Sequence, residues 1–178
     1  LRVLMCYHGI PLPAAAETTV PRIDGLWCHI GDEQDVAADL STFSGAMAAT
    51  AELLETATAT TLVLYDELGA GTDPLEGAAL GCALLETLVD RGSTVLATTH
   101  LAAIAMAATS ADGMDNAAME YDEVAGGPTY RLRVGRPGRS RGLEIAEHMG
   151  LDDAVLERAR DLLGGEHLEL DRWLQRLE

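Results

Sequence analysis

Apolar positions in the middle of the chain predict a strand, a long helix and a second strand. Residues 62–65 (LVLY) form an apolar run that is too short for a helix and typical of a strand buried on both faces. In residues 74–90 apolar positions recur at helical spacing, and residues 93–99 (STVLATT) form a second strand-like run. The helix positions expected to face the core are Leu75, Ala79, Cys82, Leu85 and Val89. A strand–helix–strand unit of this length implies a parallel sheet with a right-handed crossover.

Weaker patterns precede and follow this unit. Residues 1–10 have the spacing of the tail of a helix that Gly9 stops, and residues 25–30 (GLWCHI) have the composition of a short strand. A helical pattern follows Ser41, and a short alanine-rich helix is expected over residues 101–108.

The C-terminal part of the chain has a different organisation. Residues 114–121 and 129–134 are expected to pair as a hairpin, and two helices are expected over residues 140–149 and 152–163. Residues 166–178 have the spacing of a further amphipathic helix. The fold class expected is therefore α/β, with a parallel sheet and flanking helices.

Two adjacent carboxylates, Asp66 and Glu67, follow the central strand. In open parallel sheets the carboxyl ends of the strands are where ligands bind. An Asp-Glu pair there suits metal-assisted phosphoryl chemistry, in which the first carboxylate holds Mg²⁺ and the second orients the attacking water. The alternative is a buried strand that ends in a solvated acidic pair, because such sequences are common.

His100 directly follows the second strand of the central unit. Neighbouring parallel strands end at the same sheet edge, so we expect His100 to lie near Asp66 and Glu67. There its imidazole could reach a terminal phosphate. The competing interpretation is a core histidine whose hydrogen bonds are satisfied by its neighbours.

Ser41 and Thr42 stand where the helix before the central strand should begin. The exposed N–H groups of a helix start can bind a phosphate, although a plain N-cap is the simpler interpretation. The chain contains no lysine, so it lacks the GxxxxGK[ST] loop that cradles nucleotide phosphates.

Composition narrows the classes of protein that remain. The 178 residues suffice for one domain, and the formal net charge of -17 opposes binding of bulk nucleic acid by this chain alone. No apolar run reaches membrane-spanning length, so no membrane partner is expected. Cys6, Cys28 and Cys82 are expected to be buried thiols in a reducing cytoplasm, and His29 is expected to be structural.

Nine of the twelve arginines lie from Arg131 onward. Five of them form what we call the arginine cluster: Arg131, Arg133, Arg136, Arg139 and Arg141. The cluster is a candidate phosphate contact, and the alternative is a solvated or salt-bridged loop. The helix expected over residues 152–163 is too acidic to enter a DNA groove, which excludes a DNA-reading role for it.

These motifs, in this order, resemble the ATPase domain of the MutS family, within the ABC-type ATPases. IGDEQDVAADLSTFSGAM is similar to the family segment that carries the STF signature, LVLYDELGAGTDP to its Walker B motif and D-loop, and ATTH to its switch histidine. The resemblance implies an ABC-type P-loop NTPase core in residues 1–135 and the start of a linker helix in residues 166–178. Residues 136–165, which include PGRSRGLEIAEHMGLDDAVLERAR, resemble the helix-turn-helix dimerisation element of the family.

The resemblance also implies roles for single residues in ATP hydrolysis. Asp66 would place Mg²⁺, Glu67 would be the catalytic carboxylate, and His100 would sense the γ-phosphate. Ser41 would contact the γ-phosphate of the nucleotide on the partner subunit, so an active site would need a homodimer. Gln34 is similar to the residue of the Q-loop.

Three further stretches, GTDPLEGAAL, NAAMEYD and YRLRVGRPGRS, are similar to the second bacterial branch of the family, whose members carry a C-terminal Smr nuclease domain. This resemblance implies suppression of homologous recombination, binding of branched DNA, and ribosome rescue with an rRNA or ribosome partner. The phosphate-binding loop and the Smr domain are both absent from the sequence. The chain alone is therefore expected to be an inactive part of a longer ATPase and endonuclease.

Two other functions stay open on the sequence alone. The segment could be a catalytically silent dimerisation module of the same protein, because it carries the helix-turn-helix over residues 140–163 and lacks the phosphate-loop lysine. An ATPase of the transporter or structural-maintenance type would share the short spacing from STFSG to the Walker B strand. The LSGGQ signature of those proteins is absent, which disfavours that class.

Overall fold

The computed structural model describes residues 2–31, 42–122 and 126–163. The sheet at its centre consists of β1 (Gly25–His29), β2 (Thr61–Tyr65) and β3 (Thr94–Ala97). The strands are parallel and adjacent in the order β1-β2-β3, which confirms the parallel sheet predicted from the apolar runs. Cys28 lies beside Leu64, and Leu64 lies beside Leu96, so the three strands end at one edge.

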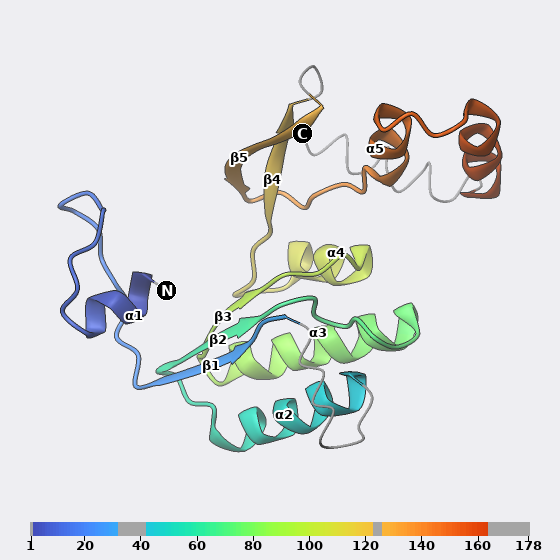
Figure 1. Cartoon of the computed structure of the whole chain (residues 1–178). Coiled ribbons are helices and arrows are strands. Elements are labelled where there is room, and N and C mark those ends of the chain that lie inside the picture. The colour runs from blue at the N-terminus through green and yellow to red at the C-terminus, as the bar shows by residue number, and fades with distance from the viewer. Residues whose placement is uncertain (1, 32–41, 123–125, 164–178) are drawn as a thin grey trace.

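Two long helices, α2 (Thr42–Thr56) and α3 (Pro74–Asp90), lie next to the sheet, and α4 (Ala102–Ser110) packs against α3 (Figure 1). The start of α3 follows from its sequence. The Asp73 carboxylate accepts hydrogen bonds from the N–H groups of Leu75 (2.9 Å) and Glu76 (3.2 Å). Pro74 fits the first turn because its fixed φ is helical and it has no N–H to satisfy.

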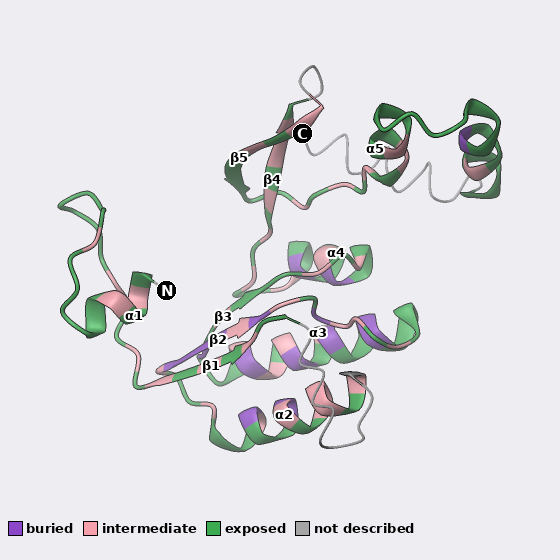
Figure 2. Ribbon diagram, in the orientation of Figure 1, coloured by how far each residue is buried: buried purple, intermediate pink, exposed green. Residues whose placement is uncertain are grey.

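The core lies between β2 and these helices. Figure 2 shows its buried positions concentrated on β2, α2 and α3. The buried cluster consists of Leu53, Val63, Tyr65, Leu68, Ala78, Leu84, Leu88 and Ile104. Since β2 has buried residues on both of its faces, the central position predicted for this strand is confirmed.

The predicted core-facing side of α3 was wrong in part. Cys82 and Leu85 are half-buried and pack against the core, as predicted. The buried residues of α3 are Gly77, Ala78, Gly81, Leu84 and Leu88. Leu75, which was expected in the core, is 80% exposed. At Gly81 the helix lies too close to α4 for a side chain, because a Cβ there would lie 2.6 Å from the Ile104 side chain.

The cysteine prediction also needs correction. Cys6 in α1 (Arg2–Tyr7) and Cys28 in β1 are exposed. Cys28 is exposed because Trp27, its neighbour in the strand, points to the core and alternate strand residues face opposite sides. Cys82 is half-buried. Its burial is the main cause that raises the pKa of its thiol, and the nearby charge of Glu86 raises it further.

The C-terminal part begins with a hairpin of β4 (Ala117–Asp122) and β5 (Gly127–Val134), which stands apart from the parallel sheet (Figure 1). Asn116 fixes the base of this hairpin to α4. Its side-chain amide donates to the Ala105 carbonyl (2.8 Å) and to the Thr109 hydroxyl (3.0 Å).

Two further helices follow the hairpin: α5 (Gly142–His148) and a helix over residues 153–163. Gly150, with φ +81°, makes the left-handed turn between them. The assignment of this helical pair as a helix-turn-helix dimerisation element stays a prediction. Within the ranges that the structure covers, no helix is both long enough and apolar enough to cross a bilayer.

Candidate functional site

The ends of the three parallel strands bring polar residues together. His29 ends β1, Asp66 and Glu67 follow β2, and Thr98 follows the last residue of β3. The backbone ladder continues past the strands: the Asp66 N–H donates to the His29 carbonyl (2.8 Å), and the Thr98 N–H donates to the Tyr65 carbonyl (2.9 Å). The two carboxylates are therefore carried between the ends of β1 and β3.

The Thr98 hydroxyl contacts both acidic residues. It donates a hydrogen bond to the Asp66 carboxylate and accepts one from the backbone N–H of Glu67 (2.9 Å). The Leu68 N–H donates to the Thr98 carbonyl (2.8 Å), and the Thr99 hydroxyl donates to the Leu68 carbonyl (2.9 Å). The segment after β3 is thus tied to the turn that bears the carboxylates.

This turn uses left-handed backbone at three positions: Glu67 (φ 53°), Gly69 (φ 85°) and Gly71 (φ 86°). Glycine adopts this conformation freely, but at Glu67 it costs on the order of 1–2 kcal/mol. Gly69 must also be small, because a Cβ there would lie 2.7 Å from the Gly77 carbonyl oxygen. Close packing against α3 therefore fixes the position of the turn.

A cavity of about 280 Å³ opens beside this turn. Its lining includes His29, Phe43, Met47, Asp66, Glu67 and Gly71. Phe43 and Met47 belong to the first turns of α2, so the cavity lies between the start of that helix and the carboxyl edge of the sheet. Both carboxylates accordingly border a space that a ligand could enter.

The residues of this site fit Mg²⁺. Proteins usually hold this ion through one or two carboxylates, with phosphate oxygens and water as the other ligands. Asp66 and Glu67 supply such a pair at the cavity. Among residues 2–31, 42–122 and 126–163 no group of three or more His, Cys, Asp or Glu side chains could hold a metal. Within these ranges, Asp66 and Glu67 are the carboxylates that the cavity offers to a divalent ion.

Three other residues were predicted for the site: His100, Ser41 and Gln34. His100 is exposed and lies at the same sheet edge, two residues after Thr98, but it is not part of the cavity lining that contains the carboxylates. Its role as a phosphate sensor stays a prediction. Ser41 and Gln34 lie outside the described residues, and α2 begins at Thr42, directly after the predicted signature serine.

His29 has the aromatic surroundings of a structural residue. Its ring stacks on Trp27, with centroids 6.0 Å apart, and tilts against Tyr65 at 5.1 Å. The Tyr65 hydroxyl is 3.3 Å from Thr50 Oγ1, which joins β2 to α2 inside the core. His29 also lines the cavity, which the sequence analysis missed although the residue ends a strand parallel to the one before Asp66.

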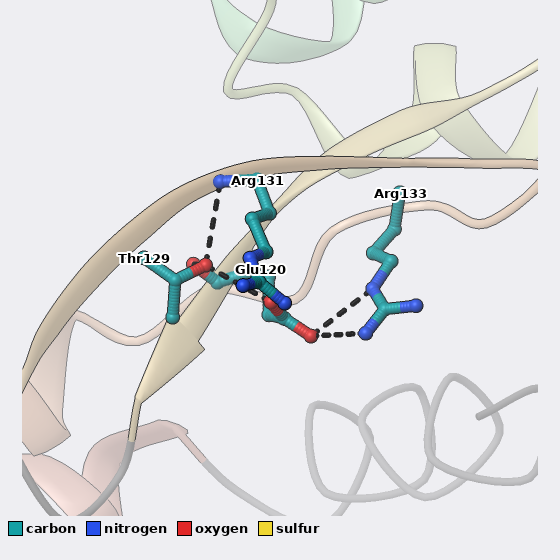
Figure 3. Close-up of polar contacts among 4 residues, drawn as sticks. All are labelled: Glu120, Thr129, Arg131 and Arg133. Carbon is teal, nitrogen blue, oxygen red and sulfur yellow. Dashed lines mark hydrogen bonds and ion pairs between the residues drawn. The ribbon is translucent and has the colours of Figure 1, made fainter.

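Glu120 on β4 neutralises one member of the arginine cluster (Figure 3). Its carboxylate accepts hydrogen bonds from Arg133 (Nε at 3.0 Å, and Nη2) and from the Thr129 hydroxyl (3.0 Å). The hydrogen bonds from Arg133 are the largest cause that lowers the pKa of the Glu120 carboxyl, and the bond from Thr129 lowers it further. Arg133 is therefore engaged within the hairpin.

Two more cluster arginines bind one carboxylate on α5. Arg139 and Arg141 each lie 2.8 Å from the Glu144 carboxylate, and both side chains are 16% exposed. The Arg141 guanidinium also lies 4.7 Å from the ring centre of Tyr121 on β4. For these three arginines the structure favours the salt-bridged loop over the phosphate contact.

Comparisons with known proteins agree with the order of the motifs. Residues 1–166 match the family description MutS domain V. The chain is 48% identical over 160 residues to a protein named Endonuclease MutS2 from Gemmatimonas aurantiaca. The matched region covers 90% of this chain and 20% of the relative. Proteins of the same name from Thermomicrobium roseum and Exiguobacterium sibiricum are 44% and 43% identical over 100% and 98% of this chain. The chain spans 22% of the length of each of these two.

Proposed function

Because this chain belongs to the MutS family, in the branch of the relatives named Endonuclease MutS2, we propose that it forms part of an ATP-binding and ATP-hydrolysing domain. One observation carries the proposal. Asp66 and Glu67 follow the central strand of a parallel sheet and border a cavity beside the start of α2. Open α/β sheets bind nucleotides at this edge, and phosphoryl transfer needs carboxylates there.

The two carboxylates have different roles in this proposal. Asp66 would hold Mg²⁺, and Glu67 would orient the attacking water and accept its proton. When bound, Mg²⁺ would offset negative charge on the phosphate oxygens of ATP. The geometry supports the division, because the Asp66 carboxylate is held by Thr98, whereas at Glu67 Thr98 binds only the backbone N–H.

We assign His100 to the γ-phosphate, Gln34 to the Q-loop position, and Ser41 to the γ-phosphate of the nucleotide on a partner subunit. The active unit is then a homodimer. Exposed apolar side chains near the C-terminus support such a contact, since large exposed apolar surface marks interaction sites. They include Ile145 (44% exposed), Met149 (76%) and Leu162 (70%).

At the scale of the whole protein, we propose that nucleotide state controls binding to branched DNA in the suppression of recombination. The same protein would act in ribosome rescue through an rRNA or ribosome contact, in the cytoplasm. The name of the relatives supports an endonuclease activity as well. These activities belong to the protein as a whole, because the chain spans only 20–22% of the relatives' length.

The test of the ATPase is Glu67→Gln in the full-length protein. We expect ATP binding to persist while kcat falls by about 100-fold or more, because the variant cannot accept a proton from water. Glu55→Gln, on the exposed surface of α2, makes the same charge change away from the cavity and should turn over ATP like the wild type. Unchanged turnover in Glu67→Gln refutes the assignment.

A catalytically silent dimerisation module is the second candidate. The exposed apolar residues of α5 and residues 153–163 favour it independently of the carboxylates. This candidate predicts a concentration-dependent dimer in sedimentation experiments together with no ATP binding by the full-length protein. Measurable ATP turnover that Glu67→Gln abolishes excludes it.

A further inference from the structure

We propose that Thr98 is a positioning residue for the two carboxylates of the site. Its hydroxyl holds the Asp66 side chain and the Glu67 backbone in the arrangement needed for divalent-cation binding and water attack. Thr98 does not line the cavity, so it acts through Asp66 and Glu67 rather than on a ligand. The inference rests on the proposed ATPase function and adds a residue to it.

Two hydrogen bonds of the Thr98 hydroxyl join the two acidic residues. An Oγ–H can donate one bond and accept others, and here it donates to the Asp66 carboxylate while it accepts from the Glu67 N–H. A bond to a carboxylate is stronger than one between neutral groups. The orientation of the Asp66 side chain is therefore coupled to the backbone conformation at Glu67.

The backbone contacts at this edge do not depend on the hydroxyl. The Thr98 N–H donates to the Tyr65 carbonyl (2.9 Å), and the Thr98 carbonyl accepts from the Leu68 N–H (2.8 Å). These two bonds would persist with any side chain at position 98. The hydroxyl adds two hydrogen bonds, and both go to the acidic pair. Its role is therefore to position these two residues, whereas the backbone bonds support the sheet.

The backbone of Glu67 gives a second reason. Its φ of 53° is unfavourable for a residue with a side chain, so neighbouring contacts must hold it there. In this conformation the Glu67 N–H donates to the Thr98 hydroxyl. Among the described residues this is its one hydrogen bond. Loss of that acceptor leaves this N–H to water and weakens the hold on the turn.

The decisive substitution is Thr98→Val, which keeps the branched shape and removes both hydrogen bonds. Thr98→Ser keeps the hydroxyl and is the conservative rescue. Thr94→Val, at the opposite end of β3, is the matched control because it removes an exposed threonine hydroxyl away from the carboxylates.

The experiment measures ATP turnover and divalent-cation affinity in the full-length protein. Mn²⁺ is the probe, followed by electron paramagnetic resonance in the presence of a non-hydrolysable ATP analogue. We expect Thr98→Val to lower kcat about tenfold and to weaken Mn²⁺ binding about tenfold, with the KM for ATP within about twofold of wild type. Thr98→Ser and Thr94→Val should bind Mn²⁺ within about threefold of wild type.

The possible outcomes distinguish a failure of the Thr98 positioning role from a failure of the proposed ATPase function. Wild-type turnover and Mn²⁺ affinity in a folded Thr98→Val protein overturn the positioning role and leave the ATPase standing. If Thr98→Val unfolds, a Thr98→Ser protein that folds but shows the tenfold losses also overturns it, since the hydroxyl is present. A wild-type protein that neither hydrolyses ATP nor binds Mn²⁺ with the analogue overturns the proposed function and this inference together.

Discussion

Gly77 is the residue whose size is most tightly limited near the candidate site. A Cβ there would lie 2.1 Å from the carbonyl oxygen of Gly69, in the turn that follows Asp66 and Glu67. Gly81 is also crowded, but its nearest neighbour is the end of the Ile104 side chain, 2.6 Å away, which can rotate. A backbone carbonyl cannot move aside in this way, so the turn depends on glycine at position 77.

We therefore predict that Gly77→Ala destabilises the fold by about 2 kcal/mol, because overpacking forces the turn and α3 apart. Gly45→Ala in α2 is the control, since nothing lies within 4 Å of the added methyl group. It should be neutral or stabilise by up to about 1 kcal/mol through helix propensity. The midpoint of urea unfolding measures both, and equal midpoints for the two variants would contradict the packing argument.

At this scale the sequence predicted the acidic pair but not its support. Asp66 and Glu67 stand out because carboxylates follow an apolar strand, and the structure places both at a cavity. Thr98 was hidden within STVLATT, since a threonine in a strand-like run is ordinary. The signal that could have found it is the parallel register, which brings the residue after β3 alongside the residues after β2.

Among the elements, the β4–β5 hairpin depends on polar contacts more than the parallel sheet does. Most of β5 is exposed, and a two-stranded hairpin is marginally stable by itself. The Glu120 carboxylate bridges the strands through Arg133 and Thr129 (Figure 3). This contact is the one most open to a test by pH.

We predict that the hairpin loses stability in acid through Glu120. Its pKa is lowered below the ordinary 4.5 in the folded state, so its stabilising contribution is complete above that value. The contribution is lost as the pH falls through the folded pKa. Urea unfolding, followed by the chemical shifts of hairpin amides at about pH 6 and about pH 3, measures the loss. Glu120→Gln should show a smaller loss, and an equal loss in both proteins would exclude this carboxyl as the cause.

Element types were predictable because each has its own periodicity, and the bounds of α3 agree with its Pro74 start and Arg91-Gly92 stop. The face that α3 buries was only partly predictable from apolar spacing, which found Cys82 and Leu85 but also gave the exposed Leu75. Hydrophobic patterns give weight to large side chains, whereas this helix makes its closest contacts through Gly77 and Gly81. Which residues of α3 are buried therefore depends on its neighbours, α4 and the turn at Gly69. The sequence pattern does not contain that information.

Over the whole molecule, charge is distributed against indiscriminate DNA binding. The formal net charge is -17, and Arg133, Arg139 and Arg141 in the arginine cluster pair with carboxylates of the same chain. Arg139 and Arg141 share the Glu144 carboxylate, so at each of the three arginines a phosphate would have to compete with an existing carboxylate. Under the proposed function, we therefore do not expect these three arginines to supply the DNA contacts of the full-length protein.

We predict that Arg139→Ala combined with Arg141→Ala leaves the salt dependence of DNA binding unchanged in the full-length protein. Fluorescence anisotropy with branched DNA at several salt concentrations gives the slope of log K against log salt. Two lost phosphate contacts would reduce the slope by about 1.8, so a change of that size would restore the phosphate interpretation. A variant with lysine at both positions keeps the charge and controls for loss of packing on Tyr121.

The strand order β1-β2-β3 follows the order in which the strands are synthesised. As translation releases about 5–20 residues per second, β2 and β3 each meet a neighbouring strand that has already been made. The turn with Asp66 and Glu67 emerges before Thr98, which arrives only after α3 and β3. During translation the two acidic residues therefore lack their hydrogen bonds to Thr98 until β3 has been made.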